Sequence, residues 1–282
     1  LDWAVIVALV GGGQEINTGE AGLAEWGREL VENFPHWQAW ISPELAHGPS
    51  GAVGQHLFAN ATDVHRARPV PSLHLDVSIR SYRSSSVAHW VDAVLRFEPE
   101  EARSIMTGIS SYPIVLTRSL ETARAWLREN CRGNRRSGLV ATSGARRLRQ
   151  YGINVEVDID EAIWFLSPPN DVRSSSFLEL AATEFAIQGL ELDWIGLCWD
   201  GDLRPVNGTW AMHQFQGTNW KLSRDEVRQQ YILNKYRVLL TRGREGLVIW
   251  IPRGDGKDRT RDPAMYDRIA EALAGFGVPS LD

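Results

Sequence analysis

The stretch from residue 223 to 251 reads S-R-D-E-V-R-Q-Q-Y-I-L-N-K-Y-R-V-L-L-T-R-G-R-E-G-L-V-I-W-I. Ser223 and Glu226 form an S-x-x-E capping box, which predicts that a helix begins here. One face of this helix carries Val227, Tyr231, Asn234 and Val238. Residues 246–251 are apolar almost throughout, as expected for a strand buried on both faces of a parallel sheet. A helix followed directly by a buried strand predicts an α/β fold.

The same alternation extends over the rest of the chain. Short apolar runs, most of them typical of strands, occur at residues 3–10, 37–41, 73–79, 113–116, 139–142, 163–166 and 190–198. Helical spacing of apolar residues predicts helices at 23–34, 87–95, 120–127 and 263–275. Residues 42–72 lack periodicity and are expected to form a long loop. The pattern predicts parallel α/β sheets in two domains, residues 1–108 and 109–282.

Composition narrows the class of protein. The 282 residues carry a formal net charge of -5, so any nucleic-acid binding must come from local arginine patches. Cys131 and Cys198 have no CxxC spacing, which favours reduced thiols in a cytoplasmic protein. No apolar run is long enough to span a membrane. Residues 1–10 are apolar but contain Asp2 in place of a basic region, so we do not expect a signal peptide.

Ligands of parallel α/β sheets bind at the carboxyl ends of the strands, so we expect the candidate residues to follow strands. Four stretches stand out, and two of them carry glycines or arginines after a predicted strand. In V-G-G-G-Q-E-I, Gln14 could bind a phosphate oxygen or an attacking water, although a plain glycine turn explains it equally. In S-I-R-S-Y-R-S, Arg80 could clamp a phosphate, but an exposed arginine pair is the commoner explanation. Each of these stretches is a weak signal alone.

Two later stretches carry stronger signals. In T-E-F-A-I-Q-G-L-E-L-D, residues 183–193, Gln188 and Gly189 make a turn and Glu191 could accept a hydrogen bond from a ribose hydroxyl. In N-K-Y-R-V-L-L-T-R-G-R-E, arginines cluster at the end of the predicted helix; they are Arg237, Arg242 and Arg244. They could complement the helix dipole or supply an arginine finger for phosphoryl transfer.

Taken in order, the four stretches resemble motifs III, IV, V and VI of superfamily 1 helicases. Their amino-acid sequences are most similar to those of the Schlafen-type family of bacterial P-loop DNA/RNA helicase-like proteins, and the resemblance covers nearly the whole chain. The resemblance implies RecA-like parallel sheets flanked by helices, with the C-terminal remainder of a first RecA-like domain followed by a second. It also implies ATP and Mg²⁺ as ligands of the complete protein, and DNA or RNA, single-stranded by preference, as a partner.

The resemblance also implies roles for particular residues. Gln14 would sense the γ-phosphate, and either Arg242 or Arg237 would be the motif VI finger. Phosphate and ribose contacts would come from Arg80 and Glu191. The nucleic-acid-facing turn would be shaped by Thr183, Gln188 and Gly189. An arginine-rich interval, in which Arg146 and Arg147 stand out, is a further candidate for nucleic-acid contact.

The chain departs from the superfamily pattern in four respects. Glycines stand where Gly-Asp usually precedes the motif III glutamine, and Phe185 replaces a histidine. No G-x-x-x-x-G-K-[ST] occurs, because the one Gly-Lys pair, Gly256-Lys257, lacks a glycine at the required spacing. No paired acids of a Walker B strand precede motif III. We therefore expect this chain to be inactive alone and to need an N-terminal P-loop segment, in cis or in trans.

Two other classes of function compete with an ATPase part. One is a non-catalytic nucleic-acid or protein-binding module derived from a helicase, since twelve tryptophans and the arginines could serve stacking and phosphate contact. Core packing accounts for most tryptophans, with Trp26 and Trp90 on apolar helix faces. The other is an unrelated α/β hydrolase, which the absence of G-x-S-x-G and HExxH disfavours. No metal-ligand cluster is expected.

Overall fold

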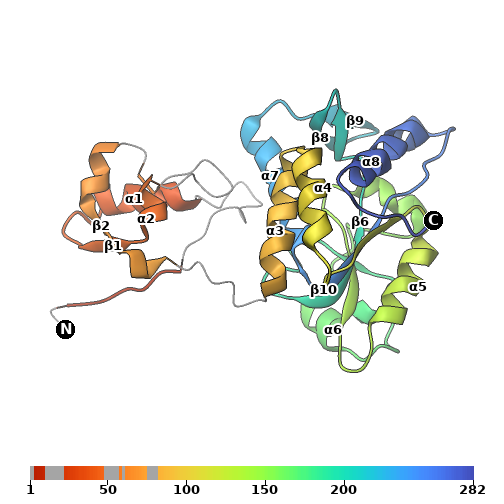
Figure 1. Cartoon of the computed structure of the whole chain (residues 1–282), viewed down its shortest axis with the longest axis horizontal. Coiled ribbons are helices and arrows are strands. Elements are labelled where there is room, and N and C mark those ends of the chain that lie inside the picture. The colour runs from red at the N-terminus through yellow and green to blue at the C-terminus, as the bar shows by residue number, and fades with distance from the viewer. Residues whose placement is uncertain (1–2, 10–21, 48–56, 59–60, 75–81) are drawn as a thin grey trace. The chain divides into compact units, whose positions relative to one another are not determined.

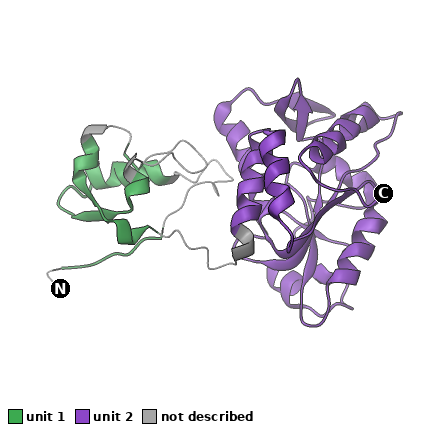
Figure 2. Cartoon of the chain, viewed as in Figure 1, with its two compact units in different colours: residues 1–77 green, residues 78–282 purple. Residues whose placement is uncertain are grey.

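The computed structural model describes residues 3–9, 22–47, 57–58, 61–74 and 82–282. The chain divides into two compact units, residues 1–77 and 78–282 (Figure 2). This division falls before the predicted boundary at 108/109, because helices of residues 82–108 pack with later elements of the second unit. The assignment of residues 1–108 to a first RecA-like domain stays a prediction.

A five-stranded parallel sheet forms the centre of residues 78–282, as the apolar runs predicted (Figure 1). Its spatial order is β3-β10-β6-β4-β5. The strands are β3 (Ile114–Thr117), β4 (Ser137–Val140), β5 (Ala181–Ala182), β6 (Leu192–Cys198) and β10 (Gly243–Trp250). All described pairings in this sheet are parallel, so all five amino ends lie at one edge and all carboxyl ends at the other.

Helices cover the sheet, as the RecA-like resemblance implied (Figure 1). The longer ones are α3 (Tyr82–Leu95), α4 (Pro99–Gly108), α5 (Leu120–Asn130), α7 (Glu226–Leu240) and α8 (Pro263–Gly275). The short helix α6 (Glu161–Leu166) forms from one of the apolar runs, with Asp160 as its cap. Helix α5 packs on four strands of the sheet, while α3 pairs with α4 and α7. The parallel α/β prediction is therefore confirmed.

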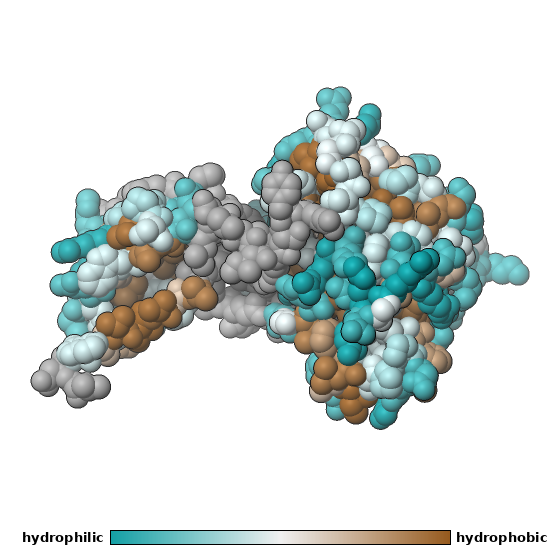
Figure 3. Space-filling model, turned by 60° about the horizontal axis from the view of Figure 1, so that its bottom comes forward, coloured by the Kyte–Doolittle hydropathy of each residue, from teal (hydrophilic) through white to brown (hydrophobic). Residues whose placement is uncertain are grey.

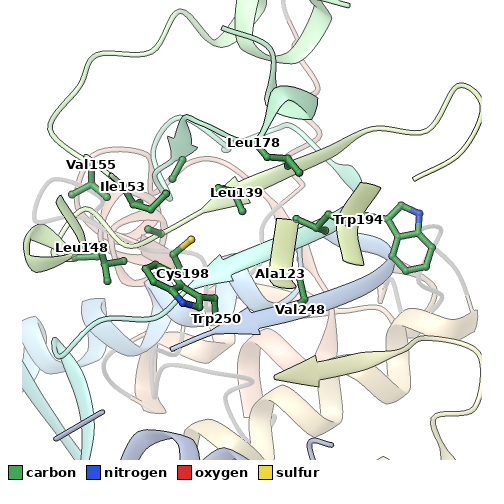
Figure 4. Packing of buried hydrophobic residues seen from close by; sticks show 14 residues of the cluster. Ala123, Leu139, Leu148, Ile153, Val155, Leu178, Trp194, Cys198, Val248 and Trp250 are labelled. Carbon is green, nitrogen blue, oxygen red and sulfur yellow. The ribbon is translucent and has the colours of Figure 1, made fainter. Parts of the chain in front are cut away.

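Strand β6 is buried on both faces, which explains its continuous apolar run. Trp194 and Cys198 point into the core beneath α5, with Val248 and Trp250 of β10 alongside (Figure 4). Gly196 lies on the same face, and a Cβ there would stand 2.7 Å from Leu139 and 2.9 Å from Leu127. A side chain at position 196 would therefore require the ends of the Leu139 and Leu127 side chains to shift.

An antiparallel three-stranded sheet, not predicted from the sequence, follows β6. Its strands are β7 (Leu203–Val206), β8 (Thr209–Gln216) and β9 (Asn219–Leu222). Asn207 and Gly208 join the first two strands with φ values of 52° and 76°. An Asn-Gly pair with both residues left-handed is a signature of tight hairpins, so V-N-G-T was the available signal.

The first residues of α7 and α8 are set by the residues that cap these helices. Asp262 accepts a hydrogen bond from the amide of Ala264 and Pro263 opens α8, as predicted. Helix α7 begins later than the capping box predicted, because Asp225 and not Ser223 accepts from the amide of Arg228. An aspartate two residues nearer to the helix displaces the serine as N-cap.

The described part of residues 1–77 is a small unit with its own core. It contains α1 (Gly22–Glu32), β1 (Ala39–Ile41), α2 (Pro43–His47) and β2 (Ala67–Pro69), with short 3₁₀ helices. Strands β1 and β2 pair in parallel, and Ile41, Leu57, Phe58 and Ala67 form the core. The expected featureless loop at 42–72 thus contains several short elements in its described parts.

Two predictions for the N-terminal unit are wrong. Residues 3–9 form no strand and are exposed, with Val7 84% exposed, because no described strand pairs with them. A doubly buried strand requires neighbours on both sides. Trp26 is 50% exposed, whereas Trp90 on α3 is fully buried as expected. The expected strand at 73–79 falls mostly outside the described residues, and Leu73 ends a 3₁₀ helix.

In the described residues, no helix is both long and apolar enough to cross a membrane. Both cysteines are free thiols, with Cys198 buried and Cys131 half-buried. Burial raises the pKa of Cys198 to about 12. On the face of residues 78–282 shown in Figure 3, hydrophilic surface predominates and hydrophobic residues form separate smaller patches.

Candidate functional site

The predicted site residues lie at opposite edges of the five-stranded sheet. Glu191 and Arg242 directly precede β6 and β10, at the amino edge. Thr183 follows β5 at the carboxyl edge, where Arg146 and Arg147 lie beyond β4. The expectation that the candidate side chains follow strands is therefore wrong for Glu191 and Arg242, whereas Thr183 does follow a strand. Gln14 and Arg80 lie outside the described residues.

At the amino edge, the parallel pairing of β6 and β10 brings motifs V and VI together. Gly243 is in register with Leu192, whose amide donates to the carbonyl oxygen of Arg242 at 3.3 Å. Glu191 forms a loose ion pair with Arg244, in which Oε2 and Nε are 4.0 Å apart. These side chains are 31% and 57% exposed, so this edge offers an acidic acceptor and a cation to solvent.

The motif V turn that leads into β6 is open. Gln188 and Gly189 are exposed, and Gly189 has a φ of 78°. A glycine suits this left-handed backbone, and nothing lies within 4 Å of the position that a Cβ would take. A ligand could therefore approach the backbone of this turn closely.

The two candidate finger arginines have different surroundings. The Arg237 guanidinium forms an ion pair with Asp92 of α3, which ties α7 to α3. Arg242 is 5% exposed and follows the last turn of α7 directly before β10. Of the two, Arg242 is the one whose backbone adjoins the motif V strand.

The arginine-rich interval does not form one patch, because β4 runs through it. Arg132, Arg135 and Arg136 precede this strand, whereas Arg146, Arg147 and Arg149 follow it. Acidic partners neutralise some of the charge, as in the pairs Arg135–Glu245 at 2.5 Å and Arg146–Glu156 at 3.3 Å. The interval therefore gives two separate, partly neutralised groups at opposite edges of the sheet.

Arg147 is held within the fold. Its Nη2 lies 2.7 Å from Oδ2 of Asp258, and its guanidinium lies 5.1 Å from the ring centroid of Phe215. Hydrogen bonds from Thr260, Arg261 and Arg147 lower the pKa of Asp258 well below its usual range. These contacts fix the loop after β10 to the 3₁₀ helix η3 (Arg146–Tyr151).

A buried ion pair joins three elements at the carboxyl edge. Glu184, fully buried, accepts hydrogen bonds from both the amide and the hydroxyl of Ser143, at 2.7 and 2.6 Å. Nζ of Lys235 lies 2.8 Å from both Glu184 Oε1 and Ser143 Oγ. This contact joins the segments after β4 and β5 to the middle of α7.

Two further buried carboxylates follow β6. Asp200 accepts from the Tyr266 hydroxyl at 2.7 Å and the Arg147 amide at 2.9 Å. Asp202 accepts from the Thr142 and Tyr236 hydroxyls at 2.5 and 2.6 Å. Burial, reinforced by the neighbouring Asp202, raises the pKa of Asp200 to about 7. Burial also raises the pKa of Asp202.

An open pocket of about 320 Å³ lies next to the buried ion pair at the carboxyl edge. One part of its lining consists of Ser143, Thr183, Phe185 and Ala186. The segment before α6 supplies the rest of the lining, with Val155, Glu156, Val157, Asp158, Ile159 and Glu161. The pocket therefore combines a motif V aromatic ring with a set of carboxylates.

Sequence reasoning missed the carboxyl-edge network. Glu184 and Lys235 are in the quoted motifs, but their pairing depends on α7 lying beside the segment after β5, which no local pattern reveals. For Asp200 and Asp202 the sequence did contain a signal, since D-G-D follows a buried strand after a single residue, Trp199. Acids at that position are placed at the carboxyl edge by the parallel topology.

Comparison with known protein families matches residues 2–253 to the Schlafen group 3 DNA/RNA helicase domain. Neither the comparison with curated proteins nor that with solved structures gave a match. The matched span includes every predicted site residue, from Gln14 to Arg242, and the whole of the five-stranded sheet. The chain therefore belongs to the Schlafen group 3 DNA/RNA helicase domain family.

Proposed function

We propose that this chain is the part of a superfamily 1 nucleic-acid-dependent ATPase that carries motifs III to VI, and that it does not hydrolyse ATP alone. The observation that carries the proposal is the meeting of motifs V and VI at the amino edge, where Leu192 bonds to Arg242 at 3.3 Å. Glu191 and Arg242 thereby stand directly before two neighbouring strands, at one edge of the sheet. In this proposal the amino edge faces the nucleotide.

The residues at this edge suit part of a nucleotide site. The Glu191 carboxylate can accept a hydrogen bond from a ribose hydroxyl, and the open turn at Gln188 and Gly189 admits close approach. Arg242 is the better finger of the two, because its backbone adjoins the strand that follows Glu191, whereas Arg237 lies in α7 and ties that helix to α3. A guanidinium there would stabilise the negative charge that develops on the phosphoryl oxygens in the transition state. Gln14 and Arg80 keep the roles that the resemblance implies.

The described residues do not fit Mg²⁺, because none of their His, Cys, Asp and Glu side chains form a group of three that could hold a metal ion. In P-loop enzymes a Ser/Thr and a Walker B Asp hold this ion, and the loop and its Lys cradle the phosphates. We assign these parts to an N-terminal P-loop segment and derive no step through the ion. ATP and Mg²⁺ are thus ligands proposed for the complete protein.

Nucleic acid is the proposed partner, with single strands preferred and the carboxyl edge as the contact. The family supports the partner class, and Thr183 and Phe185 of motif V line an open pocket there. Arg146 and Arg149 are exposed beside this edge and could contact phosphates, whereas Arg147 forms an ion pair with Asp258 that stabilises the fold. A cytoplasmic location is proposed with this function.

The test is phosphate release from ATP by the chain alone, with and without single-stranded nucleic acid, and by a version extended upstream through a G-x-x-x-x-G-K-[ST] segment. The proposal predicts no release by the chain and stimulated release by the extended version. Losing a single preorganised donor costs about a hundredfold in rate, so losing the whole cradle should abolish turnover. Release by the chain alone would contradict the proposal. An extended version that binds nucleic acid and ATP without turnover would favour a non-catalytic binding module.

A further inference from the structure

The pocket at the carboxyl edge has properties that a phosphate contact alone does not explain. We propose that it binds one unstacked nucleobase of a single-stranded nucleic acid and prefers bases with an exocyclic amino group. The inference rests on the proposed nucleic-acid binding and adds the chemistry that the pocket selects. Its basis is the combination of an exposed aromatic ring, carboxylates and an ion pair that holds the ring in place, around about 320 Å³ of open space.

The size of the pocket suits one base and part of its sugar. Binding pockets for small molecules begin at about 300 Å³, so this pocket stands at the small end of that range. Phe185 is 42% exposed and lines it. A base stacked on an aromatic side chain gains affinity regardless of its identity, because every base has a π face. The aromatic ring therefore accounts for the class of ligand.

The carboxylates account for the selectivity. Asp158 and Glu161 are exposed, and within the described residues neither side chain has a hydrogen-bond or ion-pair partner. Glu156 also lines the pocket and pairs with Arg146 at 3.3 Å. Carboxylates accept hydrogen bonds and repel phosphates, so they suit the amino group of a base and not the backbone. Cytosine, adenine and guanine carry such a group, whereas thymine and uracil do not.

The buried ion pair fixes the aromatic wall. Glu184, adjacent to Phe185, is anchored by Ser143 and Lys235 through contacts of 2.6 to 2.8 Å. Nζ of Lys235 also lies 5.4 Å from the centroid of the Phe185 ring. A cation over one face holds the ring in place. The wall is therefore organised before a base arrives, which lowers the ordering cost of binding.

The direct test is equilibrium binding of the purified chain to short fluorescent oligonucleotides at pH 7.5 and fixed salt. Oligodeoxycytidylate is compared with oligothymidylate, and with an oligonucleotide of 2-pyrimidinone, which is cytosine without its amino group. We expect the cytosine strand to bind at least about fivefold more tightly than either of the others, the lower range for a good base contact.

Two variants assign the effect to the pocket. Phe185→Ala should weaken binding of all three strands by about fivefold or more, because stacking is lost. Asp158→Asn combined with Glu161→Gln should abolish the preference for cytosine over thymine. The matched controls are Phe177→Ala, at a 36% exposed ring outside the pocket lining, and Glu271→Gln on α8. Both controls should bind like the parent, and the exposure of the altered side chains keeps folding intact.

The outcomes separate this inference from the proposed function. No binding of any strand would overturn both the pocket and the proposed nucleic-acid partner. Binding that is equal for all three strands and insensitive to Phe185→Ala would overturn the pocket alone. Equal binding of the strands, with a peptide of lysines competing only when Asp158 and Glu161 are intact, would assign the pocket to a protein's basic side chain and contradict the inference.

Discussion

The two edges of the central sheet hold charge in different ways. At the amino edge, Glu191 and Arg244 are partly exposed and their charged atoms stand 4.0 Å apart. At the carboxyl edge, Glu184 and Asp200 are fully buried and each carboxylate oxygen has a donor from the protein. The amino edge is open to a ligand, whereas the carboxyl edge is tightly linked internally with a pocket at its margin.

This difference shows that a shifted pKa alone does not locate an active site. A strongly shifted pKa in a buried acid often marks an active site, but ion-pair and hydrogen-bond networks shift pKa values too. Asp200 has such a shift, and its partners are Tyr266 of α8 and the amide of Arg147. Its contacts fasten a helix and a loop to the sheet. We therefore place the proposed chemistry at the amino edge, where the ion pair between Glu191 and Arg244 is loose.

The largest effect should come from breaking the carboxyl-edge ion pair. Lys235→Met leaves Glu184 buried without its cation, so the free energy of unfolding should fall by about 3 kcal/mol or more. Urea unfolding followed by tryptophan fluorescence measures this. Adding Glu184→Gln to the same variant should restore part of the loss. As a control for an exposed pair, Arg96→Met should change stability by less than about 1 kcal/mol. An equally small loss for Lys235→Met would refute the buried anchor.

The next effect is a pH dependence centred on Asp200. Its pKa is about 7 in the folded protein, well above the ordinary value of 3.8. Between these values the folded state keeps a proton that the unfolded chain has lost, so stability should fall as pH rises from about 4 to 7. Asp200→Asn removes this contribution.

The difference in unfolding free energy between the parent and Asp200→Asn isolates that contribution. Burial lowers the pKa of His213 to about 4, which makes stability rise with pH over part of the same window. This opposing contribution cancels in the difference because both proteins keep His213. A difference that stays constant from pH 4 to 7 would mean that Asp200 is not protonated in the folded state.

The smallest effect separates two adjacent arginines. Arg147→Ala should cost about 1 to 2 kcal/mol of stability, because it loses the ion pair with Asp258 and the contact with Phe215. Arg146→Ala should cost less than about 0.5 kcal/mol, since its side chain is 50% exposed. Thermal or urea unfolding measures both. Equal costs would show that Arg147 is no more integrated than its neighbour.

The sequence predicted what depends on local signals. Strand β10 was predicted from its apolar run, because a strand buried on two faces needs apolar residues throughout. Helix α8 was predicted from Asp262-Pro263, because helix capping favours particular residues at the first positions. The apolar run at 3–10 wrongly predicted a buried strand, because its described residues, 3–9, pair with no described strand and are exposed. Long-range contacts such as Glu184–Lys235 leave no local pattern.

The site was predicted in part for the same reason. Glu191 and Arg242 meet at one edge because β6 and β10 are neighbours, which their order along the chain does not reveal. Arg146 and Arg135 appear close in sequence, yet the intervening strand β4 carries them to opposite edges. Periodicity identifies elements, whereas strand order decides which side chains share an edge.

We propose that the amino edge, through Arg242, serves phosphoryl transfer. The most direct test of this proposal is steady-state phosphate release and ATP binding by the upstream-extended protein, comparing Arg242→Ala with Arg237→Ala, each checked for folding by urea unfolding. We expect Arg242→Ala to lower turnover about a thousandfold while ATP binding persists, because a finger acts on the charge of the transition state. Arg237→Ala should instead lose the tie to Asp92 and keep most of its turnover. Loss of turnover in folded Arg237→Ala, with Arg242→Ala fully active, would contradict the proposal.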